Sequence, residues 1–156
     1  MTGVVLDLVT LRDELERARQ RGARVVLTNG VFDLLHVGHL RYLRAARRAG
    51  DLLVVGLNAD SAVNKPGRPL VPEAERAELV AALEPVDYVV LFGEPTADEL
   101  LRAVRPDVYV KGADYSEATL PEASTARDLG AQLLFVELVP NRSTSELARA
   151  MRSGER

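Results

Sequence analysis

Short runs of apolar residues alternate along this chain with longer segments in which apolar residues recur at the spacing of a helix. The runs lie at residues 24–28, 51–58, 88–92, 107–110 and 132–138, and we expect each to form a strand. The run at 51–58 is almost unbroken, which is typical of a parallel strand buried on both faces. Strands that alternate with helices predict one α/β domain over residues 1–156, with a mostly parallel five-stranded sheet and helices on both faces.

Capping residues mark where the predicted helices begin and end. The first helix is predicted at about residues 10–22, before the sheet, with Thr10 as its cap and Gly22 as its stop. The last is predicted to begin at residues 143–146, where Ser-Thr-Ser-Glu has the pattern of a capping box. Because the sequence shows no repeat, low-complexity tract or internal linker, one domain accounts for the whole pattern.

Residues 28–39 are where we expect the chemistry of the protein. This stretch follows the first predicted strand and contains both histidines of the chain, His36 and His39. Their spacing of three residues places them on one face at the start of a helix, where free backbone N–H groups and the helix dipole attract anions. Gly30 and Gly38 leave room for a phosphate to approach the backbone closely. Two histidines in the first turn of a helix can equally be ordinary surface residues, so the spacing alone does not establish a site.

Composition excludes several classes of protein. The chain has 156 residues, of which 47% are hydrophobic and 28% charged, as in ordinary globular proteins. A formal net charge of −3 gives no reason to expect binding to nucleic acid or to a membrane surface. The absence of cysteine excludes disulfides, thiolate nucleophiles and thiolate metal sites. No leader or membrane-spanning apolar stretch is evident, so we expect a cytoplasmic protein.

The two lysines stand out, because all other residues among the 20 basic ones are arginines. Lys65 lies in a polar, turn-rich loop at residues 59–69, which we interpret as a mobile active-site loop. Lys111 ends the fourth predicted strand. Ligands of open parallel sheets bind beyond the carboxyl ends of the strands. If the first and fourth strands are neighbours, one crevice would gather the histidines, Lys111 and the helix start at Ser143, with Lys65 able to close over it.

Motifs of other enzyme classes are missing. The sequence contains neither a G-x-G-x-x-G turn after the first strand nor a Walker loop. It also shows no grouping of nucleophile, base and orienting acid. The remaining hydrogen-bond donors and cations suit the binding of phosphate groups. Transfer of a nucleotidyl group to a phosphorylated acceptor fits best, because the attacking phosphate is already anionic and needs no strong base.

The stretch from Thr28 to His39 resembles the His-x-Gly-His motif of the nucleotidylyltransferase superfamily. The sequence Thr-Asn-Gly-x-Phe-Asp-Leu-Leu-His is similar to the sugar-phosphate and polyol-phosphate branch. The first helix, the Leu-Asn-Ala-Asp turn at 57–60 and the Lys-Gly-Ala-Asp-Tyr sequence at 111–115 are most similar to the D-glycero-β-D-manno-heptose 1-phosphate adenylyltransferases of ADP-heptose biosynthesis. Ala113 stands where that branch usually has glycine.

This resemblance implies a Rossmann-like fold and transfer of AMP from ATP to a sugar 1-phosphate, with release of pyrophosphate by direct in-line attack on the α-phosphorus. It also implies Mg²⁺ held mainly by the triphosphate, with no metal site on the protein. The partners would be ATP and a phosphorylated sugar, and a homodimer is left open. It implies catalytic roles for His36, His39 and Lys65, and nucleotide binding by Thr28, Asn29, Gly30, Val31, Phe32, Gly38, Arg76, Lys111, Gly112, Asp114, Ser143 and Thr144.

Two of these positions, and also Asp33, have simpler interpretations. Arg76 can be an exposed helix arginine instead of a phosphate ligand, and Ser143 can be a plain helix cap. Asp33 can orient the loop or a histidine, but we favour an ordinary turn aspartate. The protonation of the two histidines does not follow from the sequence.

Two other functions stay open. One is a glycerol-3-phosphate-type cytidylyltransferase that uses CTP, although the Arg-Thr pair expected shortly before the final Ser-Thr-Thr is not evident at residues 138–139. The other is a nucleotide-binding module without turnover, which is less expected because both histidines and both lysines are present.

Overall fold

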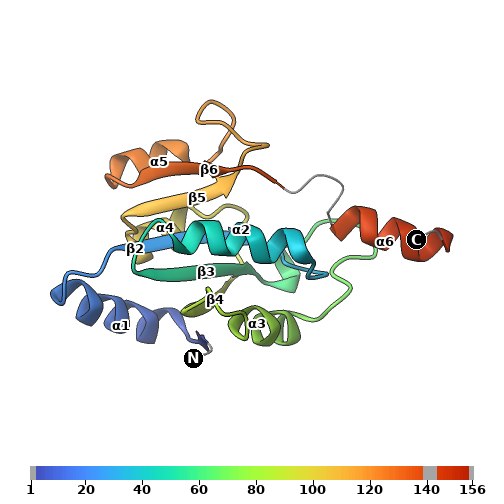
Figure 1. Cartoon of the computed structure of the whole chain (residues 1–156), viewed down its shortest axis with the longest axis horizontal. Helices are drawn as coiled ribbons and strands as arrows, with labels where there is room; N and C mark the ends of the chain where they lie inside the picture. Colours follow the sequence, from blue (N-terminus) through green and yellow to red (C-terminus); the bar gives the residue numbers. More distant parts are fainter. Residues whose placement is uncertain (1–2, 139–143, 155–156) are drawn as a thin grey trace.

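The computed structural model describes residues 3–138 and 144–154, which form one six-stranded parallel sheet covered by helices (Figure 1). The strand order is β1-β4-β3-β2-β5-β6, and every neighbouring pair is parallel. The strands are β1 (Val4–Val5), β2 (Val25–Gly30), β3 (Leu52–Asn58), β4 (Tyr88–Phe92), β5 (Val108–Gly112) and β6 (Gln132–Val136). The α/β class and the parallel sheet predicted from the sequence are therefore confirmed.

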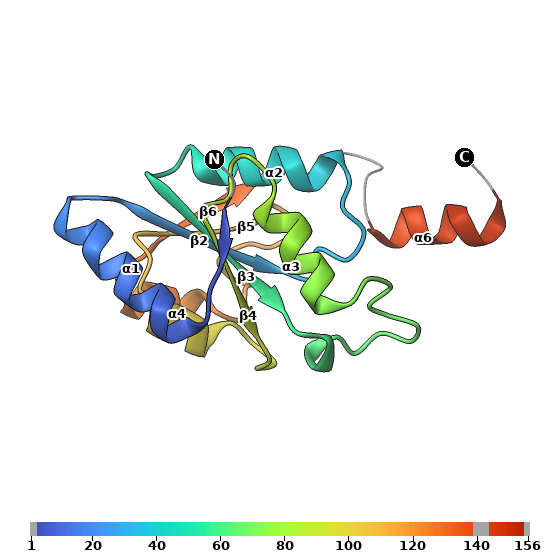
Figure 2. The ribbon, with the colours of Figure 1, turned by 90° about the horizontal axis from the view of Figure 1, so that it is seen from below.

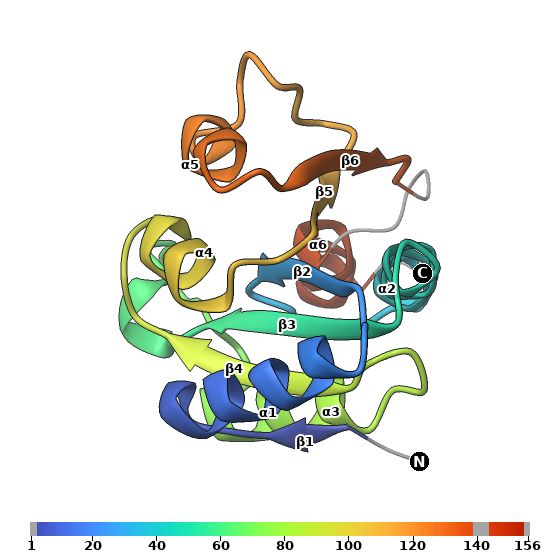
Figure 3. The same ribbon diagram turned by 90° about the vertical axis from the view of Figure 1, so that its left-hand side faces the viewer.

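Helices cover both faces of the sheet, as predicted. They are α1 (Leu8–Gln20), α2 (Val37–Arg47), the 3-10 turn η1 (Asp60–Ala62), α3 (Glu73–Ala81), α4 (Asp98–Val104), α5 (Ala123–Asp128) and α6 (Thr144–Ser153). Figure 3 shows α4 and α5 on one side of the sheet and α2 on the other. Apolar side chains of α1, α4 and α5 share one core cluster, whereas those of α2 and α3 share the second.

Alternation along the strands explains why the sheet has two cores. Val25 and Leu27 of β2 belong to the cluster beneath α1 and α4, whereas Val26 between them belongs to the cluster beneath α2 and α3. Successive side chains of a strand point to opposite faces, so a strand with a core on each side must be apolar throughout. Leu27 is fully buried, and its truncation to alanine would cost about 2–5 kcal/mol.

The structure differs from the sequence prediction at the N-terminus. It adds β1, which pairs Val4 with Tyr88 and Val5 with Val89, and this strand is too short to produce a pattern. Helix α1 begins at Leu8, two residues before the predicted cap. Asp7 caps it, because the Asp7 carboxylate accepts a hydrogen bond of 2.7 Å from the backbone N–H of Thr10.

The strand order reverses at β2, one of the two central strands. From β2 the chain proceeds through β3 and β4 on one side and later through β5 and β6 on the other. Thr28 of β2 lies in register with Val110 of β5, which precedes Lys111. The predicted adjacency of these two strands is confirmed, and their carboxyl ends mark the point where open sheets bind ligands.

Helix α6 lies beyond the carboxyl ends of the strands, away from the other helices (Figure 2). Its Ser145 side chain lies 3.4 Å from a guanidinium nitrogen of Arg68, which belongs to the loop between η1 and α3. Within residues 3–138 and 144–154, no helix is both long and apolar enough to cross a membrane.

Candidate active site

Two cavities adjoin at the carboxyl ends of β2 and β5. The strand cavity has a volume of about 270 Å³ and is lined by Asn29, Gly30, Val31, Phe32, His36, Gly38, His39, Tyr42, Lys111, Gly112, Asp114, Tyr115 and Leu138. The loop cavity has a volume of about 530 Å³ and is lined by Val31, Phe32, Asp33, His39, Ala62, Val63, Asn64, Lys65, Arg68, Asp114 and Ser145. Val31, Phe32, His39 and Asp114 line both and form the shared wall of the two cavities.

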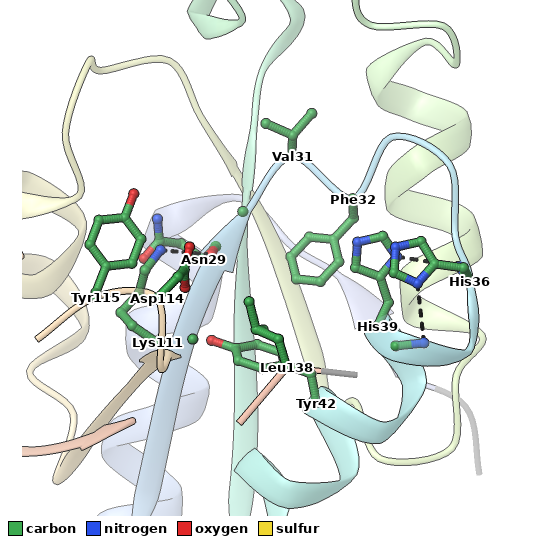
Figure 4. Close-up of a pocket in the computed structure, with 13 residues that line it drawn as sticks. Asn29, Val31, Phe32, His36, His39, Tyr42, Lys111, Asp114, Tyr115 and Leu138 are labelled. Carbon is green, nitrogen blue, oxygen red and sulfur yellow. Dashed lines mark hydrogen bonds between the residues drawn. The ribbon is translucent and has the colours of Figure 1, made fainter. Parts of the chain in front are cut away.

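The histidine pair begins helix α2, as the spacing predicted. His36 is the N-cap, and its Nδ1 accepts a hydrogen bond of 3.1 Å from the Gly38 N–H. The backbone N–H of His36 donates to Nδ1 of His39 at 3.3 Å, and the two rings stack with centroids 3.9 Å apart (Figure 4). Because each Nδ1 accepts a hydrogen bond, each neutral ring carries its proton on Nε2. The helix start therefore fixes both rings in the tautomer that donates from Nε2.

Burial keeps the His39 ring neutral. Loss of solvent, and secondarily repulsion from His36, lowers the pKa of His39 from 6.5 to about 4. At neutral pH the ring is therefore an uncharged donor. A phosphate anion brought beside it would raise this pKa, because a negative charge favours the imidazolium form.

Phe32 adopts a backbone conformation that aromatic residues rarely take. Its φ of 51° lies in the left-handed region, where an L-residue is strained by about 1–2 kcal/mol. Its ring folds back over Gly30, where an added Cβ would lie 3.0 Å from the ring carbon Cε2 of Phe32. The ring centroid lies 5.2 Å from that of His39. A side chain at position 30 would therefore have to displace this ring by a few tenths of an ångström.

Lys111 occupies the opposite side of the strand cavity with Asn29, Asp114 and Tyr115 (Figure 4). Its Nζ donates to the backbone carbonyl of Asn29 at 3.3 Å and lies 5.3 Å from the centroid of the Tyr115 ring. Burial lowers the pKa of Lys111, against the opposing effect of nearby carboxylates. The Asn29 side chain is oriented by Tyr109, whose hydroxyl donates to its Oδ1. Lys111 and the histidines thus face one cavity, as predicted.

Thr28 lines neither cavity, so the predicted contact with the nucleotide has no support from the cavity geometry. Its side chain is fully buried beneath the strand cavity and donates to the carbonyl of Val110 at 2.9 Å. The Tyr42 hydroxyl lies 2.7 Å from Thr28 Oγ1 and donates to the same carbonyl at 3.0 Å. Alternation along β2 directs Thr28 into the layer between the sheet and α2. The residue that reaches the cavity from this layer is Tyr42, one helical turn after His39.

Arg76 also differs from both of its predicted roles. Its side chain is 1% exposed, so it is no surface arginine, and it lines neither cavity. The guanidinium donates to the carbonyls of Val71, Val31 and Asn58 at 2.8, 2.6 and 3.0 Å, and to Asp60 Oδ1 at 2.6 Å. Directed at these acceptors, it joins the ends of β2 and β3 to the start of α3. Arg76 therefore supports the site from within the protein and is not placed to bind phosphate.

The favoured interpretation of Asp33 as an ordinary turn aspartate is wrong, because this residue orients the loop that carries Lys65. Its buried carboxylate accepts hydrogen bonds from the backbone N–H groups of Leu70 and Val71, each at 2.9 Å, and from Arg68 at 2.8 Å. Burial works to raise the pKa of Asp33, but these donors together lower it. Lys65 is exposed at the edge of the loop cavity.

The other predicted nucleotide-binding residues lie as follows. Gly30, Val31, Gly38, Gly112 and Asp114 all line the strand cavity. A Cβ on Gly112 would lie 2.6 Å from Asp114 Oδ1, so a larger residue there would have to displace the Asp114 carboxylate. Ser143 lies outside the described residues, and Thr144 begins α6.

Ala113 is compatible with the loop after β5. The non-glycine residues with positive φ in the described ranges are Phe32 and Arg105, so no left-handed backbone requires a glycine at position 113. The Ala113 N–H instead continues the pairing with β6 by donating to the Val136 carbonyl at 2.8 Å.

Sequence reasoning missed several residues that line the cavities: Tyr42, Arg68, Tyr115 and Leu138. A usable signal existed for Tyr42, three residues after His39 on the same helix face, and for Tyr115, which belongs to the motif at 111–115. Arg68 was indicated only as part of the predicted active-site loop at residues 59–69, and Leu138 gave no signal, because it approaches the site only through the folded chain. Among the described residues, no three His, Asp or Glu side chains come together as a metal-binding group.

Comparisons with known proteins agree with this geometry. Residues 27–150 match the model of the cytidylyltransferase-like family. The chain is 50% identical over 141 residues to the bifunctional protein HldE of Syntrophotalea carbinolica, covering 88% of this chain and 29% of that protein. It is 45% identical over 152 residues to HldE of Methylobacillus flagellatus, covering 96% and 31%. The chain thus spans about three-tenths of the length of these curated relatives.

A solved structure is also similar. The lipopolysaccharide core biosynthesis protein of Thermoplasma volcanium GSS1 is 34% identical and matches with a TM-score of 0.64, over 76% of this chain and 98% of that one. The family match, these relatives and the paired histidines at the start of α2 agree with one another. The chain therefore belongs to the cytidylyltransferase-like family, which confirms the nucleotidylyltransferase superfamily predicted from its sequence.

Proposed function

We propose that this protein transfers AMP from ATP to a sugar 1-phosphate of the heptose 1-phosphate type, with release of pyrophosphate. The observation that carries this proposal is the wall shared by the two cavities, formed by Val31, Phe32, His39 and Asp114. A bisubstrate reaction needs two adjoining sites whose ligands meet beside the catalytic donors. His39 stands at that meeting point.

We assign the strand cavity to the nucleotide and the loop cavity to the acceptor. The strand cavity offers the flat Tyr115 ring, the Leu138 side chain and the Asn29 amide, which suit a base and ribose, beside Lys111. The loop cavity offers two cations, Lys65 and Arg68, which suit the phosphate of the acceptor. His39 would then lie beside the α-phosphate.

The proposed chemistry requires alignment and charge stabilisation. An oxygen of the acceptor phosphate attacks the α-phosphorus, and the bond from that phosphorus to the bridging oxygen of the β-phosphate breaks as pyrophosphate leaves. No proton has to be removed from the acceptor phosphate. His39 donates from Nε2, while Lys111 and Lys65 reduce the repulsion between the two anions. Mg²⁺ bound mainly through triphosphate oxygens would supply further charge neutralisation.

The choice of adenine and heptose rests on sequence similarity. Relatives at 45–50% identity carry the name HldE, and the motif at 111–115 is similar to heptose 1-phosphate adenylyltransferases. Those relatives are bifunctional and about three times as long, so we propose that this chain corresponds to their adenylyltransferase portion.

A pyrophosphate-release assay that crosses ATP and CTP with heptose 1-phosphate and glycerol 3-phosphate tests the proposal. We expect release with ATP and heptose 1-phosphate, and its loss in His39→Ala. Release with CTP and glycerol 3-phosphate alone would establish the cytidylyltransferase alternative. Binding of ATP without release with either acceptor would establish a non-catalytic module.

A further inference from the structure

The backbone around Phe32 is held on both sides by side chains from other segments. Before it, the Val31 carbonyl accepts a hydrogen bond of 2.6 Å from the buried guanidinium of Arg76 on α3. After it, the Asp33 carboxylate accepts hydrogen bonds from the backbone N–H groups of Leu70 and Val71. Phe32 therefore has little freedom to leave its left-handed conformation, in which φ is 51°.

This conformation directs the aromatic ring onto His39. The Phe32 side chain is buried, with 6% of its surface exposed, and its ring meets the His39 ring at an interplanar angle of 52°. The other side of the His39 ring stacks on His36. His39 is thus enclosed between two rings at the shared wall of the cavities, and Figure 4 shows Phe32 beside it.

We propose that Phe32 is a positioning residue, whose ring, held by its left-handed backbone, fixes the orientation of His39 and excludes water from it at the shared wall. The inference rests on the proposed function, because it assigns His39 to the reacting phosphate. Phe32 itself needs no contact with the reacting atoms. An aromatic residue is strained in this left-handed conformation, whereas a glycine would adopt the same φ without strain. The ring must therefore contribute something that offsets this strain.

The groups around His39 determine how its titration responds to Phe32. His36 stacks on it from α2, and Asp33, Lys65, Arg68 and Asp114 line the loop cavity beside it. Lys111 lies across the strand cavity. Burial is the first cause of the lowered pKa of His39, and repulsion from His36 is the second. Removing the Phe32 ring weakens the first cause and leaves the charged groups in place.

Histidine NMR titration tests the positioning role directly, because the chain has two histidines. The variants are Phe32→Leu, which keeps bulk without a flat ring, and Phe32→Gly, which accepts the left-handed backbone without strain. We expect the pKa of His39 to rise from about 4 toward 6.5 in both, most in Phe32→Gly. We also expect kcat to fall about tenfold or more, with KM for ATP changed less than about threefold.

Phe92→Leu is the matched control, since Phe92 is 7% exposed and lines neither the strand cavity nor the loop cavity. We expect it to lower the melting temperature without moving the His39 titration. If folded Phe32→Leu and Phe32→Gly titrate like wild type, or lose only stability as Phe92→Leu does, Phe32 has no positioning role. The titration needs no substrate, so wild type that releases no pyrophosphate would overturn the proposed function separately.

Discussion

The site consists of two halves that the fold treats differently. In the strand half, formed by the β2–α2 junction and the end of β5, His36, His39 and Lys111 are partly buried and hydrogen-bonded to backbone groups. In the loop half, at residues 60–71, Asp33 and Arg76 hold the backbone at its C-terminal end, at Leu70 and Val71, while Lys65 is exposed. In the proposed reaction, the strand half would be preorganised to meet charge that develops in the transition state, whereas Lys65 would have freedom to adapt to the acceptor.

His39→Ala gives the largest expected effect, because it removes a fixed donor from the strand half. We expect kcat to fall about a hundredfold or more, with a much smaller change in ATP affinity, since a donor matched to the transition state acts on the chemical step. Pyrophosphate release and ATP titration measure the two quantities. Turnover within about threefold of wild type would contradict a catalytic role for His39.

Lys111→Arg tests whether the strand half requires one geometry. The guanidinium is planar and longer than the ammonium, so in this partly buried position it would displace the nucleotide although the charge is kept. We expect about a tenfold loss of activity with an unchanged melting temperature. Arg102→Lys, an exchange on an exposed side chain, serves as the control and should change neither. Full activity of Lys111→Arg would contradict a preorganised strand half.

Lys65→Arg applies the same exchange to the loop half. Because the side chain is exposed on a loop, we expect the guanidinium to find a productive position, with a loss of only about twofold to threefold. Steady-state kinetics for the acceptor and for ATP, measured beside Lys111→Arg, decide the comparison. An equal or larger loss than in Lys111→Arg would reverse the assignment of rigid and adaptable halves.

The last expected effect is absent at neutral pH and concerns stability under acidic conditions. The pKa of His39 is about 4 in the folded protein and 6.5 in an unfolded chain, so the unfolded chain binds more protons between these values. The contribution of neutral His39 to stability is complete above pH 6.5 and is lost as the pH falls to about 4. The free energies of unfolding of wild type and His39→Gln, measured in urea, should converge as the pH falls through this window. A difference independent of pH would mean that His39 is not buried as a neutral ring.

Most of the fold could be predicted from local patterns in the sequence. Unbroken apolar runs predicted β2 to β6, because a parallel strand between two helix layers must be apolar on both faces. The two-residue strand β1 and the capping of α1 by Asp7 escaped this reasoning, since both depend on one or two residues.

The α/β fold, the family and the histidine pair at the start of α2 could all be predicted without the structure. The histidine pair was predictable because spacing within one helical turn fixes which side chains share a face. The contacts of Arg76 and Thr28 and the backbone conformation of Phe32 could not be predicted in that way. Arg76 and Thr28 are buried because segments distant in the sequence surround them, and Phe32 is held in a strained conformation by contacts on both sides. A local pattern records periodicity, but it does not record which distant carbonyl or carboxylate will meet a side chain.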